Sequence, residues 1–109
     1  MMKIIDIGHN NYSADKAISV LETEVSNAMC SNKIRSIKII HGHGSGILRK
    51  AVHRWCQEQE GRFRDVILGE EHDLFHQKSI AMRQESGLPD DRDFGRRNRA
   101  VTYLWLYKK

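Results

Sequence analysis

Residues 41–46, with the sequence His-Gly-His-Gly-Ser-Gly, constrain the fold of this chain more than any other segment. They follow residues 34–40, a run rich in β-branched side chains that predicts a buried strand. They precede apolar residues at helical spacing, which predict a helix from about Gly46 to Gly61. A strand, a glycine-rich turn and a helix in immediate succession are typical of an α/β fold built from strand–helix–strand units.

The same alternation continues along the rest of the chain. The predicted strands and main helices are strands 3–7, 34–40, 63–68 and 100–107, and helices 14–29 and 46–61. Ser13 is a good N-cap for the first helix, and Asp15 lies in its first turn, where the helix dipole favours an acid. We therefore expect an α/β fold, a two-layer βαβαββ sandwich with a mixed, partly parallel four-stranded sheet and two main helices.

Residues 69–98 interrupt this alternation and contain little core-forming material. We expect a variable insertion here, with a short helix that packs over one edge of the sheet and a turn or disordered stretch at 89–91. The last strand carries bulky side chains on both faces, which predicts burial on both sides, while its direction stays open. The length suits one domain over residues 1–109.

Composition excludes some classes of protein. No apolar run approaches the roughly 20 residues needed to cross a bilayer, and Asp6 comes too early for the apolar part of a signal peptide. Cys30 and Cys56 are isolated thiols, which we expect to be reduced packing residues. We therefore expect a cytoplasmic protein with no membrane contact. The formal net charge of +4 suits either a polyanionic partner or solubility alone.

Two motifs follow the first two predicted strands. Residues 6–9, Asp-Ile-Gly-His, follow the first, and residues 41–46 follow the second. In open α/β sheets, ligands bind outside the carboxyl ends of the strands. We expect the two motifs to meet in one anion pocket if the strands are parallel neighbours.

The glycine-rich segment has the chemistry of a phosphate site. Glycines permit positive φ, and the amides of the segment and of the following helix start can approach an anion. Arg49 and Lys50 lie one turn into that helix and are placed to clamp a phosphate. The alternative is a tight turn that binds nothing. The spacing G-x-G-x-G, without Gly-Lys-Ser, disfavours a nucleotide cofactor.

Residues 39–52, Ile-Ile-His-Gly-His-Gly-Ser-Gly-Ile-Leu-Arg-Lys-Ala-Val, resemble the hallmark segment of Smr (small MutS-related) domains. The resemblance runs from the first strand to the third. It implies a single Smr-like domain, with a fold similar to the C-terminal domain of a bacterial translation initiation factor. It also implies nucleic-acid binding, with DNA nicking or RNA cleavage in several members. The chain departs from the family where Gly8 takes the usual histidine position and His9 follows one residue late, and where residues 95–99 replace a glycine-rich turn.

The resemblance and the residue chemistry together suggest an endonuclease or nickase with little sequence preference. His9 or His41 would be the general base or acid, and Asp6 would orient that histidine or hold a divalent cation such as magnesium. Asp6 as a turn cap and His43 as a spacer are the alternatives. The expected contacts to the phosphate backbone of DNA or RNA are Gly42, His43, Gly44, Ser45, Gly46, Arg49, Lys50, Arg96, Arg97 and Arg99, with Lys108 and Lys109 adding to the basic region.

Two other functions stay open. One is a DNA- or RNA-binding module that recognises structure without cleaving, and the other is an adaptor that docks a protein partner through residues 69–98. Exposure of Leu74 and Phe75 would support the adaptor. His72 and His76, four apart, have the spacing of a helical metal pair, but no further ligands accompany them, so we assign no metal site. We expect His53 on the exposed side of the second helix.

Overall fold

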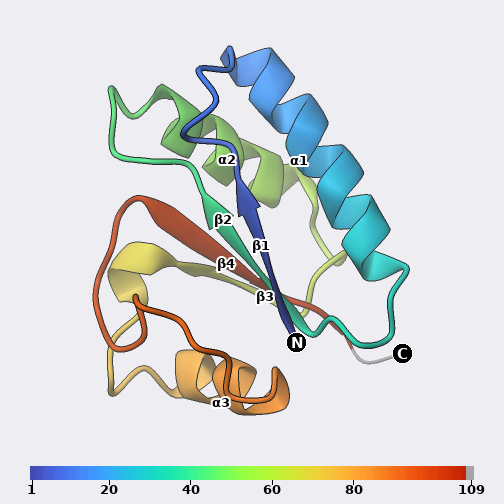
Figure 1. Cartoon of the computed structure of the whole chain (residues 1–109), viewed down its shortest axis with the longest axis vertical. Helices are drawn as coiled ribbons and strands as arrows, with labels where there is room; N and C mark the ends of the chain where they lie inside the picture. The colour runs from blue at the N-terminus through green and yellow to red at the C-terminus, as the bar shows by residue number, and fades with distance from the viewer. Residues whose placement is uncertain (108–109) are drawn as a thin grey trace.

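The sheet has the strand order β1-β2-β4-β3 in the computed structural model, which describes residues 1–107 (Figure 1). Its strands are β1 (Met2–Asp6), β2 (Ser36–Ile40), β3 (Asp65–Leu68) and β4 (Val101–Trp105). β1 and β2 pair in parallel, whereas β4 runs antiparallel to both β2 and β3. The predicted mixed four-stranded sheet is confirmed, and the direction of the last strand, which the sequence left open, is antiparallel.

Helices α1 (Ala14–Met29) and α2 (Ile47–Glu58) cover one face of this sheet (Figure 1). The Ser13 hydroxyl accepts a hydrogen bond of 3.2 Å from the Lys16 amide, and Asp15 lies in the first turn, so the predicted start of α1 is confirmed. The apolar faces of both helices pack on alternate residues of the strands. The fully buried members of this core include Leu21, Val25, Ile37, Ile39, Val52 and Leu104.

The insertion covers the opposite face of the sheet rather than one edge, which corrects our expectation. It holds a short 3-10 turn, η1 (Gly69–Glu71), and helix α3 (Gln77–Glu85), which lies below the sheet in Figure 1. Met82 of α3 joins a second apolar cluster with side chains of β3 and β4: Ile67, Val101, Tyr103 and Trp105. Because β4 is apolar on both faces and fully buried, as predicted, a third layer has to cover its second face.

A buried lysine fixes the far end of the insertion to the sheet. Lys38 of β2 is 4% exposed, and its Nζ lies 2.6 Å from a carboxylate oxygen of Asp91 and 2.6 Å from one of Asp93. The Tyr103 hydroxyl also donates to Asp91, at 2.7 Å. Burial alone would raise the pKa of both carboxyls, but these hydrogen bonds outweigh burial and hold each pKa below its ordinary value. Residues 89–91, expected as a turn or disordered stretch, are therefore ordered.

Cys30 and Cys56 are both free thiols, the first exposed and the second buried. Burial raises the pKa of Cys56 to about 12, so this thiol stays protonated at neutral pH. Within residues 1–107, no helix combines the length and the apolar composition that a membrane span requires.

Replacing Lys38 by Met should destabilise the protein by about 3 kcal/mol at pH 7, because two buried carboxylates lose their cation. A carboxyl whose pKa is depressed in the folded state stabilises that state at pH values above its ordinary pKa of about 4. This contribution is lost as the pH falls through the pKa of the folded state. The penalty of Lys38→Met should therefore shrink towards pH 3. Urea unfolding at pH 7 and pH 3 measures it, with Lys3→Met on exposed β1 as the control. A penalty that is equal at both pH values would contradict this role.

Candidate functional site

The carboxyl ends of β1 and β2 lie side by side. Asp6 pairs with Ile40, and the Ile7 amide donates to the Ile40 carbonyl at 2.9 Å. Gly8 then rests directly on the peptide that follows His41, since a Cβ at position 8 would lie only 2.8 Å from the His41 carbonyl carbon. The predicted meeting of the two motifs is confirmed, with His9 and the glycine loop lining one hollow, whereas Asp6 does not line it. The contact also explains why residue 8 is glycine and the histidine follows it, because no side chain fits at position 8.

The segment 41–46, which we call the glycine loop, alternates the sign of its φ angles. Gly42, Gly44 and Gly46 have φ of 81°, 34° and 87°, whereas His43 and Ser45 stay in the negative region. A backbone that alternates in this way can turn successive N–H groups towards one side and form a concave anion site. The Gly42 amide donates to the Ala100 carbonyl at 3.1 Å, which corrects its predicted role as a phosphate contact, so the amides open to an anion are those after Gly42. At Gly44 and Gly46 an added Cβ would meet no atom within 4 Å, so the positive φ itself requires glycine there.

The start of α2 lacks the groups that usually satisfy a helix N-terminus. Gly46 is its N-cap and offers no side-chain hydrogen bond, and the first turn contains no acidic residue. Arg49 and Lys50 stand close to that turn instead, although cations are unfavourable near the positive end of a helix dipole. α1 differs, because Ser13 and Asp15 satisfy its N-terminus. The start of α2 is therefore suited to an anion that residues 1–107 do not provide.

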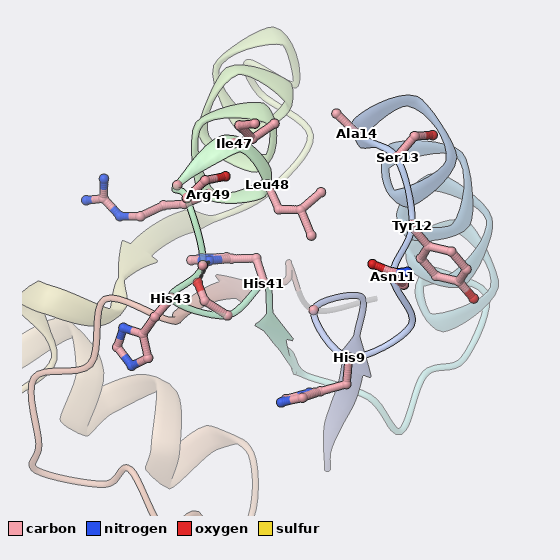
Figure 2. Close-up of a pocket in the computed structure, with 15 residues that line it drawn as sticks. His9, Asn11, Tyr12, Ser13, Ala14, His41, His43, Ile47, Leu48 and Arg49 are labelled. Carbon is pink, nitrogen blue, oxygen red and sulfur yellow. Dashed lines mark hydrogen bonds between the residues drawn. The ribbon is translucent and has the colours of Figure 1, made fainter.

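Two hollows flank the glycine loop. The larger one, of about 510 Å³, lies between the N-terminal ends of α1 and α2 (Figure 2). His9 and Asn11 of the β1–α1 connection line it, and Asn11 has a positive φ of 56°, which is uncommon outside glycine. The second hollow, of about 360 Å³, is lined by the glycine loop together with Arg49, Lys50 and Arg99. The loop therefore presents polar backbone to a cavity on each side.

An exposed histidine and a carboxylate form a pair beside the larger hollow. His9 Nδ1 lies 2.7 Å from Asp6 Oδ2, and Asp6 Oδ1 accepts the Gly8 amide at 2.9 Å. Because a carboxylate accepts, Nδ1 carries the hydrogen, and the lone pair of the neutral ring is on Nε2. No hydrogen bond to residues 1–107 involves that Nε2, and the His9 side chain is 73% exposed. The pair thus joins an oriented imidazole to an open surface.

His41 lies under the glycine loop and does not face the solvent. The residue is 3% exposed; its Nε2 lies 2.9 Å from the Thr102 hydroxyl and its Nδ1 3.4 Å from the Gly42 carbonyl. Burial, reinforced by neighbouring cationic groups, lowers the pKa of His41 to about 4, although the Gly42 carbonyl opposes the shift. A neutral ring with both nitrogens engaged does not fit the predicted role as general base or acid. His41 instead supports the loop from below.

His53 is also placed differently from the prediction. Its ring is partly buried between α2 and the sheet, with Nε2 3.4 Å from the Thr102 hydroxyl and its centroid 5.9 Å from that of His41. Both imidazoles therefore contact the same hydroxyl, that of Thr102 on β4. Burial lowers the pKa of His53.

The basic residues near the glycine loop differ in whether a carboxylate pairs with them. The Arg49 guanidinium forms an ion pair with Glu70 of η1 and extends away from the larger hollow (Figure 2). Arg97 pairs with Asp73 at 3.1 Å. Lys50, Arg96 and Arg99 are exposed. No local sequence pattern indicates a role for Glu70, because its partner Arg49 is 21 residues away. Lys108 and Lys109 lie outside the described residues.

The insertion histidines are structural. His72 is 2% exposed and packs on Tyr103, with ring centroids 4.6 Å apart, while the His76 ring bonds the Ser79 hydroxyl. Residue 72 precedes α3, so the two rings do not share a helical face. Among residues 1–107, no three His, Cys, Asp or Glu side chains are grouped to hold a metal ion.

Comparison with known proteins gives a consistent result. The family model described as the Smr domain matches residues 9–77, which is more than half of the chain. Endonuclease MutS2 of Brevibacillus brevis is 33% identical over 53 residues, which cover 49% of this chain and 7% of that protein. The crystal structure of the Smr domain of Thermus thermophilus MutS2 superposes with a TM-score of 0.60 at 16% identity, covering 96% of this chain and 98% of that one.

Proposed function

The chain belongs to the Smr domain family, and on this basis we propose that it binds the phosphate backbone of DNA or RNA at the glycine loop and hydrolyses phosphodiester bonds there. We place this activity in the cytoplasm. The relative named as an endonuclease supports the reaction class, but the chain spans only 7% of its length. The proposal rests mainly on one observation, the His9–Asp6 pair beside an amide-lined hollow at the start of α2.

The geometry supports a division of roles. Amides of residues 43–46 and of the first turn of α2 would hold the phosphoryl oxygens, where the helix dipole also favours negative charge. His9 Nε2 would take a proton from water as the water oxygen attacks phosphorus and the bond to the leaving oxygen breaks. Asp6 would hold the ring and stabilise the imidazolium, and solvent would return a proton to the leaving oxygen. His41 would act as a positioning residue.

The alternative role of Asp6 is to hold a magnesium ion. Its two carboxylate oxygens already accept from the Gly8 amide and from His9, so the present arrangement favours the orienting role. Measuring cleavage with and without a chelator separates the two roles, because cleavage that persists without divalent cations needs no metal at Asp6.

A specific observation favours a second candidate, the protein adaptor. The residues Leu74 and Phe75 are 56% and 86% exposed, as that alternative requires. The binding module without cleavage is the third reading, and it shares the phosphate contacts of the first.

Replacing His9 by Ala or Asp6 by Asn should abolish cleavage while leaving nucleic-acid affinity within about three-fold, because both side chains act on the proton transfer. General acid–base catalysis contributes roughly 10²- to 10⁴-fold, so the rate should fall by at least about 100-fold. Supercoiled plasmid and structured RNA, each with magnesium and with chelator, are the substrates.

Asp15→Asn, which removes an exposed acid from the first turn of α1, is the matched control and should cleave normally. Binding without cleavage by the native chain would support the non-catalytic module. Absence of both binding and cleavage would refute the proposal and favour the adaptor.

Replacing Arg49 by Ala should weaken binding and reduce the slope of log K against log salt by about one, the loss of one phosphate contact. Glu70→Gln should have the opposite effect on affinity, because it releases the Arg49 guanidinium from its ion pair. Fluorescence anisotropy at several salt concentrations measures both, with Glu60→Gln as a control at the end of α2. Binding that does not depend on salt would contradict phosphate contact.

A further inference from the structure

Phe75 is the most exposed large apolar side chain of the described residues, at 86%, and it stands on an ordered turn. Its amide donates to Asp73 Oδ1 at 2.8 Å, and the His76 amide donates to the Asp73 carbonyl at 3.3 Å. Leu74 packs against Gly95, where an added Cβ would lie 2.6 Å from Leu74 Cδ2. The Phe75 ring thus stands in solvent without a partner from residues 1–107. The folded state forgoes the free energy that burial of this apolar surface would contribute.

The turn is tied, contact by contact, to the segment that leads back to the glycine loop. The Asn98 amide donates to the Gly69 carbonyl at 2.9 Å, and Arg97 pairs with Asp73 at 3.1 Å. Together with the contact between residues 74 and 95, these contacts join residues 69–74 to residues 95–98 along their length. Figure 1 shows this segment running from the insertion up to the start of β4.

The same segment ends at the phosphate site. Arg99 lines the second hollow with the glycine loop, and the His41 and Gly42 amides both donate to the Ala100 carbonyl. Four residue steps separate Arg99 from Gly95, which is about 14 Å at most for extended chain. This segment therefore provides a continuous path from the second hollow to the turn that carries Phe75, which a strand of several nucleotides would have to span.

Charge along this path is mixed, with two arginines left unpaired. Arg96, Arg97 and Arg99 are all exposed, and Arg97 pairs with Asp73. Glu70 pairs with Arg49 and Glu71 is exposed, so Arg96 and Arg99, which form no ion pair within residues 1–107, are the cations that would meet a polyanion. A protein partner would need a larger surface, since a standard interface buries about 800 Å² on each side around an apolar centre. Here the apolar surface at the turn consists of Phe75 and part of Leu74, with guanidinium groups beside it. Such a combination of an aromatic face and arginines suits a single-stranded nucleic acid.

We propose that Phe75 is a stacking platform for an unpaired base of the nucleic acid whose backbone lies at the glycine loop. This inference rests on the proposed function, because it adds a base contact to that phosphate site. It assigns to the insertion a preference for substrates in which a single-stranded segment adjoins the bound backbone. Stacking tolerates every base, so the preference is for unpaired structure and not for sequence.

The test compares a hairpin that carries a single-stranded tail with a blunt hairpin of equal phosphate number, by fluorescence anisotropy. Phe75→Ala should weaken binding of the tailed hairpin by at least about five-fold, the lower range for one stacked base. It should leave the affinity for the blunt hairpin within about two-fold. Phe75→Trp should restore the preference, and Leu88→Ala, another exposed apolar residue, should change neither affinity.

The outcomes separate this inference from the function beneath it. If the native chain binds neither hairpin, the proposed function fails, and the inference fails with it. If it binds both and Phe75→Ala changes neither affinity, only the inference is overturned, and the exposed ring becomes a candidate protein contact. Equal weakening of both affinities would also overturn it, because it would show a general effect on the surface and not stacking on an unpaired base.

Discussion

The contact on which the site depends is the approach of the β1–α1 connection to the peptide after His41. Gly8 has no side chain, so the connection can lie directly on the backbone at the end of β2. This places the Asp6–His9 pair and the glycine loop at one rim, with the starts of α1 and α2 on either side. Below the loop, His41 and Thr102 fill the space with a neutral hydrogen-bonded pair. The open surface is left with backbone amides and one oriented imidazole.

The insertion has two connected effects on this rim. Its helix covers the apolar second face of β3 and β4, and Asp91 and Asp93 bind the buried Lys38 of β2. Separate contacts hold the near end: Glu70 pairs with Arg49, and Arg99 lines the second hollow. A segment with little core-forming material thus packs as a third layer and also adjusts the charge around the glycine loop.

Local patterns predicted the elements and the meeting point of the two motifs. The isoleucine-rich strands, the Ser13 cap and the alternating glycines each specify backbone geometry through nearby residues, and the structure agrees with all three. Contacts between distant residues were beyond such patterns. Lys38 stands in an apolar strand, and the two aspartates that neutralise it lie more than 50 residues away. The contacts of His41 and His53 with the Thr102 hydroxyl of β4 are similarly distant in sequence, and no pattern near either histidine indicates them.

The most direct test of the phosphate site is an NMR titration of the ¹⁵N-labelled chain with a short oligonucleotide. Binding at this site should produce saturable shifts of the amide resonances of Gly44, Gly46 and the first turn of α2, all with one dissociation constant. The amides at the end of α1 should stay unchanged in the same titration. Shifts confined to α3 or to the free edge of β3, with the glycine loop unaffected at saturation, would contradict phosphate binding at the glycine loop.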